Sequence, residues 1–260
     1  MTLSPQHSSF NLPSWQLLLL FITGLAAGFI DSIAGGGGLI TLPVLLSLGI
    51  DPRKALGTNK LQATCGSGSA TWHYARAKTV PLNDCVRGFL FSLLGAALGT
   101  LAVQQLEPSA LKRAIPVLLI AVAIVVLLRP QMGSTDVPAR MPRPWFDILF
   151  GLALGFYDGF FGPGTGTFWT MAYVSVLGFN LTKATAYSKV VNFASNLSSL
   201  GFFLWQGNIY FAAGVAMGAG QMLGAKIGSG MVITRGTKFI RPIFITVVLA
   251  IAVKLLIHPT

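Results

Sequence analysis

Charged residues are scarce in this chain. Only 10% of its 260 residues are Asp, Glu, Lys or Arg, whereas 53% are hydrophobic, and the mean hydropathy is +0.70. A soluble domain usually carries about 25% charged residues. The composition therefore excludes an ordinary soluble protein and predicts an all-α polytopic membrane protein.

Acidic residues are the scarcest of the charged residues. Seven Asp and Glu stand against 18 Lys and Arg, which gives a net charge of +11. In a soluble protein this excess would suggest a nucleic-acid partner. Here the basic residues are spread over short loops between hydrophobic runs, as in the cytoplasmic loops of membrane proteins. We therefore expect a lipid bilayer around the chain and no nucleic-acid partner.

Cysteine and catalytic motifs are also nearly missing. The two cysteines, Cys65 and Cys85, have neither the spacing of a metal site nor that of a redox pair. The sequence contains no GK[ST] phosphate loop, no HExxH motif and no serine nucleophile elbow. We expect no cofactor, no metal and no enzymatic activity.

Hydrophobic runs are abundant, and they fall into two groups. Residues 1–14 form a polar tail without the Lys or Arg that begins a secretory signal, so a retained helix is expected from Trp15. We predict a first transmembrane repeat over 15–129, a cytoplasmic linker over 130–144 and a second repeat over 145–260. The expected segments are 15–33, 39–49, 53–74, 86–104 and 111–128 in the first repeat, and 145–161, 167–178, 182–205, 209–233 and 242–257 in the second.

Two glycine-rich stretches interrupt these segments. Gly35–Gly38 is a run of four glycines, and Gly162–Gly166 reads GPGTG. Each Gly in a helix interior costs roughly 0.5–1 kcal/mol relative to Ala, so such density indicates a break. Broken helices at corresponding places in two halves of a membrane protein point to a transport site. A tight helix crossing without a ligand is the alternative.

The two halves repeat the same residues in the same order. Asp31 corresponds to Asp158, Gly49 to Gly178, Lys54 to Lys183 and Lys60 to Lys189, at a nearly constant spacing. Each half crosses the membrane five times, or three times if its second and third segments form a re-entrant hairpin. Both numbers are odd, so we predict inverted repeats, which are common in secondary transporters. The loops richest in Lys and Arg belong in the cytoplasm, which places both termini in the periplasm of an inner-membrane protein.

Four motifs resemble one known family. They are GFIDSIAGGGG at 28–38, LGTNKLQ at 56–62, GFYDGFFGPGTG at 155–166 and KATAYSKVVN at 183–192. These motifs and their order are similar to the TauE/SafE family of sulfite and sulfonate exporters, and the resemblance covers about 15–257. The resemblance implies a transporter of sulfite, a sulfonate or a related small organic anion, driven by a proton or other ion gradient.

The candidate site residues lie in and around the two breaks. Asp31 and Asp158 stand in apolar stretches, where an ionisable group is costly and is by default a functional candidate, so both are candidates for ion coupling. A structural aspartate that holds the broken backbone is the alternative. Substrate contacts are expected from glycine backbone, buried lysines and polar neighbours: Gly35, Gly36, Gly37, Gly38, Thr58, Asn59, Lys60, Gln62, Gly164, Gly166, Ser188, Lys189 and Asn192.

The predicted function is transport of a small anion, which the two lysines deepest in their segments, Lys60 and Lys189, would attract. Snorkelling of these lysines to the interface is the structural alternative. A passive anion channel of the same fold, a membrane-embedded enzyme and a non-transporting membrane subunit are the competing functions. The sequence leaves open the anion, the direction, the coupling ion and whether the chain forms a homo-oligomer.

Overall fold

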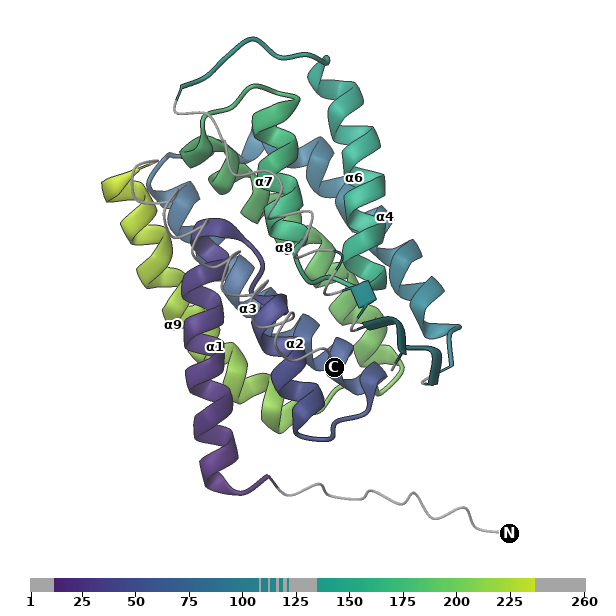
Figure 1. Ribbon diagram of the computed structural model, residues 1–260. Coiled ribbons are helices and arrows are strands. Elements are labelled where there is room, and N and C mark those ends of the chain that lie inside the picture. Colours follow the sequence, from purple (N-terminus) through teal and green to yellow (C-terminus); the bar gives the residue numbers. More distant parts are fainter. Residues whose placement is uncertain are drawn as a thin grey trace.

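The computed structural model describes residues 12–107, 109–111, 113–115, 117–118, 121 and 135–236. Within these ranges the chain forms helices joined by turns and loops, and it has no strand (Figure 1). The expected segment over 242–257 lies outside the described residues, and most of 111–128 does too. The described elements are α1 (Ser14–Ala34), α2 (Gly38–Ser47), α3 (Pro52–Arg76), η1 (Leu82–Cys85), α4 (Val86–Gln104), α6 (Arg143–Phe160), α7 (Thr165–Ser175), α8 (Leu181–Trp205) and α9 (Phe211–Arg235).

Local sequence signals fix the start of the two longest polar helices. The Asp51 side chain accepts hydrogen bonds from the backbone N–H groups at the start of α3, and Pro52 occupies its first turn. At the corresponding place, Asn180 caps α8 by accepting from the N–H of Lys183. Short polar side chains at this position satisfy otherwise unpaired N–H groups. The residues just before each helix therefore set where α3 and α8 begin.

Both glycine stretches break a helix, as predicted. Gly35–Gly37 separates α1 from α2, and Phe161–Gly164 separates α6 from α7. Gly36 and Gly164 both have φ of +87°, in the left-handed region that favours glycine. The breaks are shorter than expected, because Gly38 already belongs to α2 and Gly166 to α7.

The helices pack in a reciprocal pattern. Helices α3 and α8 contact each other at the centre; α1, α2 and α9 cover α3, while α4, α6 and α7 cover α8. The most extensive contacts join α1 to α9 and α4 to α6, so two helices from the N-terminal half of the chain each pack on a helix from its C-terminal half. At the α4–α6 crossing a Cβ on Gly99 would overlap the backbone carbonyl of Phe156, and only glycine permits this approach.

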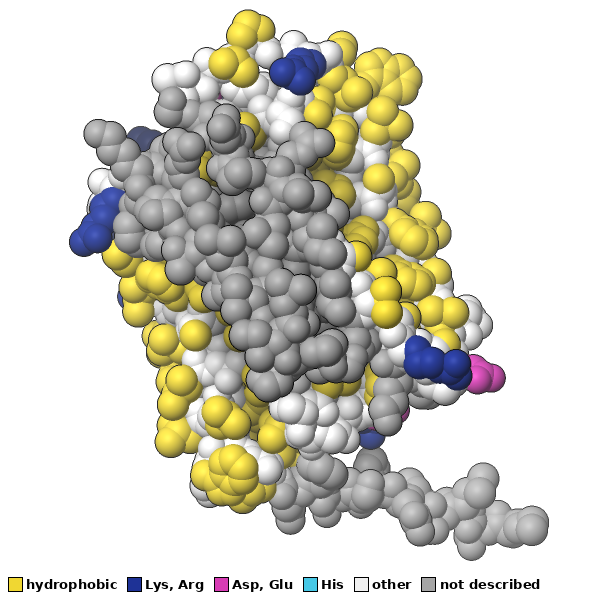
Figure 2. All heavy atoms as spheres, viewed as in Figure 1, with side chains coloured by type: hydrophobic (Ala, Val, Ile, Leu, Met, Phe, Trp, Pro, Cys, Tyr) yellow, Lys and Arg dark blue, Asp and Glu magenta, His cyan; other side chains and the backbone are white. Residues whose placement is uncertain are grey.

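The outer surface is apolar, whereas the central helices carry polar side chains inward. Figure 2 shows large areas of hydrophobic side chains and few charged ones on the visible described surface. Within the described residues, Ser14–Ala34 and Leu82–Gln104 are long and apolar enough to cross a membrane, with mean hydropathies of 2.1 and 1.7. The central α3 and α8 are less apolar because their buried faces carry lysines, amides and hydroxyls.

Candidate functional site

A small polar cavity lies where the two helix breaks meet. It is lined by Asp31, Gly36, Gly37, Gly38, Asn59, Ala63, Asp158, Gly162, Gly164, Thr165, Gly166, Asn192, Asn196 and Gln221. Its volume of about 20 Å³ holds roughly one water molecule. The structure thus brings together nine of the residues predicted from the sequence, including both aspartates and most of the glycines.

The first buried ion pair joins α3 to the end of α6. Lys60 Nζ lies 2.7 Å from Asp158 Oδ1, and both side chains are almost completely buried. The ammonium also donates to the backbone carbonyl of Asp158 and, at 3.3 Å, to Asn196 Oδ1. All three polar hydrogens of the lysine therefore have acceptors, which a buried ammonium requires.

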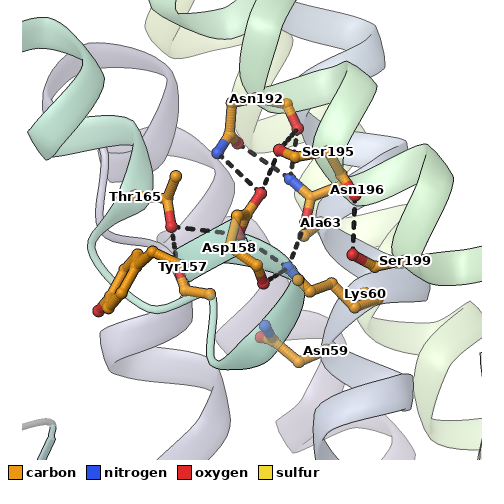
Figure 3. A network of polar contacts seen from close by, with 12 residues as sticks. Asn59, Lys60, Ala63, Tyr157, Asp158, Thr165, Asn192, Ser195, Asn196 and Ser199 are labelled. Atoms are coloured by element: carbon orange, nitrogen blue, oxygen red, sulfur yellow. Dashed lines mark hydrogen bonds and ion pairs between the residues drawn. The ribbon is translucent and has the colours of Figure 1, made fainter. Parts of the chain in front are cut away.

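The Asp158 carboxylate accepts from three further side chains. Thr165 Oγ1 donates to Oδ1 at 3.1 Å, Asn192 Nδ2 donates to Oδ2 at 3.4 Å, and Ser195 Oγ also donates to Oδ2. Figure 3 shows these side chains pointing toward the carboxylate from α7 and α8, with Lys60 on its other side. This carboxylate is held by donors on three helices besides its own.

The second buried ion pair joins α8 to the end of α1. Lys189 Nζ lies 3.0 Å from Asp31 Oδ2, and the lysine is fully buried. The N–H of Gly37 donates to Asp31 Oδ1 at 3.1 Å. A Cβ on Gly166 would stand 3.0 Å from Lys189 Nζ, so glycine at this position leaves room for the ammonium.

Each ion pair joins a lysine from one half of the chain to an aspartate from the other half. Lys60 and Asp31 belong to the first repeat, yet Lys60 pairs with Asp158 and Asp31 pairs with Lys189. The sequence predicted that both lysines lie deep in the protein, which their burial confirms. It did not predict the pairing, although charges buried near a membrane centre usually pair with one another.

Several predicted substrate contacts lie behind the cavity wall instead. Gln62 donates to Thr41 Oγ1 and Asn59 Oδ1, and Ser188 Oγ accepts from Thr170. Thr58 accepts from the N–H of Tyr210 at the start of α9. The residues Gly35, Thr58, Lys60, Gln62, Ser188 and Lys189 do not line the cavity itself. Thr58, Gln62 and Ser188 connect helices in this conformation, and their contact with substrate stays a prediction.

Sequence reasoning missed four polar side chains at the site: Thr165, Ser195, Asn196 and Gln221. Ser195 and Asn196 lie on α8 one helical turn from Asn192, and Thr165 begins α7 between the predicted residues Gly164 and Gly166. The positions of these three next to predicted residues would have found them. Gln221 on α9 carried no such signal. In the described part of the chain no three His, Cys, Asp or Glu side chains gather as a metal site.

Comparison with known proteins places the chain in a family. The sequence model of the family described as Sulfite exporter TauE/SafE matches residues 20–255. This chain belongs to the TauE/SafE family. The match covers both helix breaks and both buried ion pairs, and it confirms the resemblance found in the sequence.

This TauE/SafE member is similar to several curated proteins over nearly its full length. It is 46% identical to the probable membrane transporter protein ORF9 of Sinorhizobium sp., with 94% of each chain covered. It is 47% identical to a probable membrane transporter protein of Haemophilus influenzae (88% of this chain and 90% of the relative) and 43% identical to YfcA of Escherichia coli K12 (96% and 93%). No solved structure matches. The chain is a membrane-embedded member of a transporter family.

Proposed function

We propose that this protein is a secondary transporter that moves a small anion (sulfite, a sulfonate or a related organic anion) across the inner membrane, coupled to an ion gradient. The observation that carries this proposal is the pair of exchanged lysine–aspartate contacts beside a polar cavity between two broken helices. Buried charges in a membrane are costly, and in transporters they mark the path of the substrate and of the coupling ion.

The cavity offers donors that suit an anion. Helices α2 and α7 begin at it, and the first N–H groups of a helix carry partial positive charge. The amides of Asn59, Asn192 and Asn196 line it, and both ammoniums lie directly behind. A sulfonate-type anion has only acceptor oxygens, so this set of donors matches its chemistry.

The membrane arrangement belongs to the same proposal. We place two inverted halves, 15–129 and 145–260, around the cavity, with the linker 130–144 in the cytoplasm and both termini in the periplasm. The reciprocal packing of α1 on α9 and of α4 on α6 supports two related halves. The test is to introduce single cysteines at the linker residue Val137 and at Asn208 and to label them with a membrane-impermeant reagent. We expect only Asn208→Cys to react from the periplasmic side of the membrane.

A carrier fits the structure better than an open channel. The cavity holds about one water molecule, so a sulfonate does not fit until the helices around it move apart. A site that must open to admit its substrate suits alternating access. An imposed ion gradient separates the two functions in sealed vesicles, because a carrier accumulates the anion against its own gradient and a channel does not.

The test is anion flux into liposomes that contain only the purified chain. A thermal-shift screen of sulfite, thiosulfate, sulfonates and small carboxylates first selects the anion, because a ligand that binds the folded state stabilises it. We expect Lys60→Ala and Lys189→Ala to impair flux strongly. Lys226→Ala removes an exposed lysine on α9 and serves as the matched control. Normal flux in both buried-lysine variants would refute the proposal that these ammoniums serve transport.

A further inference from the structure

The two exchanged ion pairs are not equivalent. Asp158 accepts from four side chains, and its own side chain is 2% exposed. Asp31 accepts from one side chain, Lys189, and from the N–H of Gly37, and its side chain is 13% exposed and lines the cavity. Both carboxylates line the cavity, but Asp158 is held by many partners, whereas Asp31 has few and is the more exposed of the two.

The sequence repeat explains the difference. Thr165, Asn192 and Ser195 hold Asp158 through their side chains. At the spacing that separates Lys60 from Lys189, Asn192 and Ser195 correspond to Ala63 and Gly66. Where the second break has Thr165, the first break has only glycines, Gly35–Gly38, and none of these residues has a side chain that can donate a hydrogen bond. The first repeat therefore lacks the donors around Asp31 that the second repeat provides around Asp158.

The charges of the site sum to zero when all four groups are ionised. Each ammonium is neutralised by one carboxylate, so a bound monoanion would leave one uncompensated negative charge in a buried site. Such a charge is strongly disfavoured away from water. One proton on a carboxylate removes this excess and frees its lysine to face the anion.

Asp31 is the carboxylate that fits this role. The charged or titratable side chains around it are Lys189 from α8 and the Tyr74 hydroxyl from α3, which donates to the Ser32 carbonyl. Asp158 from α6 lines the same cavity but is paired with Lys60. Within the described residues α2, α7 and α9 bring no charged side chain to the cavity, and α9 contributes Gln221. The Oε1 atom of Gln221 is buried without a hydrogen-bond partner in the described structure, so it is free to accept from a protonated carboxyl or from water.

We propose that Asp31 takes up a proton from the aqueous side to which the site opens, that the anion then binds beside Lys189, and that both cross together while Lys60 and Asp158 stay paired. One proton and one monoanion move in the same direction, and no net charge crosses. This inference rests on the proposed anion transport and adds its coupling ion, its stoichiometry and the residue that binds the proton.

The experiment measures what drives anion flux in liposomes. For the wild type we expect flux to follow an imposed pH gradient, to be unaffected by a potassium–valinomycin potential, and to carry one proton per anion when a pH dye is entrapped. In Asp31→Asn the side chain stays neutral at every pH, as the protonated aspartate is. We expect its flux to lose the response to the pH gradient and to become driven by the potential. Asp147→Asn neutralises another buried carboxylate, outside the cavity lining, and should behave as the wild type.

The outcomes separate this inference from the proposed function. Wild-type flux that follows the potential, or Asp31→Asn flux that still follows the pH gradient, would overturn the role of Asp31. Absence of flux for every anion in the wild type would contradict the proposed transport itself. If Asp31→Asn does not fold, the proton-to-anion ratio and the potential dependence of the wild type still decide whether the pair crosses without net charge.

Discussion

Neutralising Asp158 should destabilise the fold more than neutralising Asp31. Removing one partner of a buried ion pair leaves the other charge uncompensated, which costs about 3–5 kcal/mol. In Asp158→Asn the ammonium of Lys60 keeps only neutral acceptors, and three donors lose a carboxylate. Asp31→Asn also strands a buried ammonium, that of Lys189, but only one further donor, the N–H of Gly37, loses the carboxylate, and the group lines a cavity that can hold water. We therefore expect a loss near the lower end of this range, about 3 kcal/mol.

The assay is reversible unfolding in mixed micelles, with the free energy of unfolding taken from SDS titrations of each variant. The double variant Lys60→Met/Asp158→Asn removes both charges, and we expect it to recover a large part of the loss, because no lone charge remains buried. With the wild type and the single variants Lys60→Met and Asp158→Asn, it completes a double-mutant cycle that isolates the pair. Equal losses of unfolding free energy for the two aspartate variants, or no recovery in the double variant, would refute the reasoning that Asp158 stabilises the fold more than Asp31.

Two further predictions concern packing and the linker. Gly99→Ala should lower the free energy of unfolding by about 1–3 kcal/mol, because its Cβ would overlap a backbone carbonyl of α6. Gly201→Ala places its Cβ in open space and should be neutral or slightly stabilising. The same SDS titrations compare the two variants. The N–H of Asn180 and the ammonium of Lys183 hold the pKa of Asp136 below its usual value. Its contribution, at most about 1 kcal/mol at an exposed site, is therefore present at neutral pH and lost as the pH falls through the lowered pKa. The stability difference between the wild type and Asp136→Asn should shrink as the titrations are repeated from pH 7 downward, and a difference that grows would contradict this sign.

Much of the helical architecture follows from local sequence. The range expected for one helix, 86–104, is the range of α4, and the ends of the other described α-helices differ from expectation by at most three residues. The short helix η1 was not expected. Asp51 caps a helix because a carboxylate before Pro52 accepts from free N–H groups, and this requires no distant residue. The inverted orientation of the halves and the periplasmic termini stay predictions, because they depend on a membrane.

The sequence alone determined where the helices break, because dense glycine destabilises a helix locally. It also indicated that Lys60 and Lys189 are buried, because each lies well inside a long hydrophobic segment. The tertiary structure decided how those charges pair. Lys60 and Asp158 are 98 positions apart, and Lys189 and Asp31 are 158 apart. Only the packing of the two repeats against each other brings them into contact. That packing also shows that four side chains donate to Asp158 and only one donates to Asp31. Ala63, Gly66 and the glycines of the first break are the sequence counterpart of this difference, which becomes visible only when the partners of Asp31 are known.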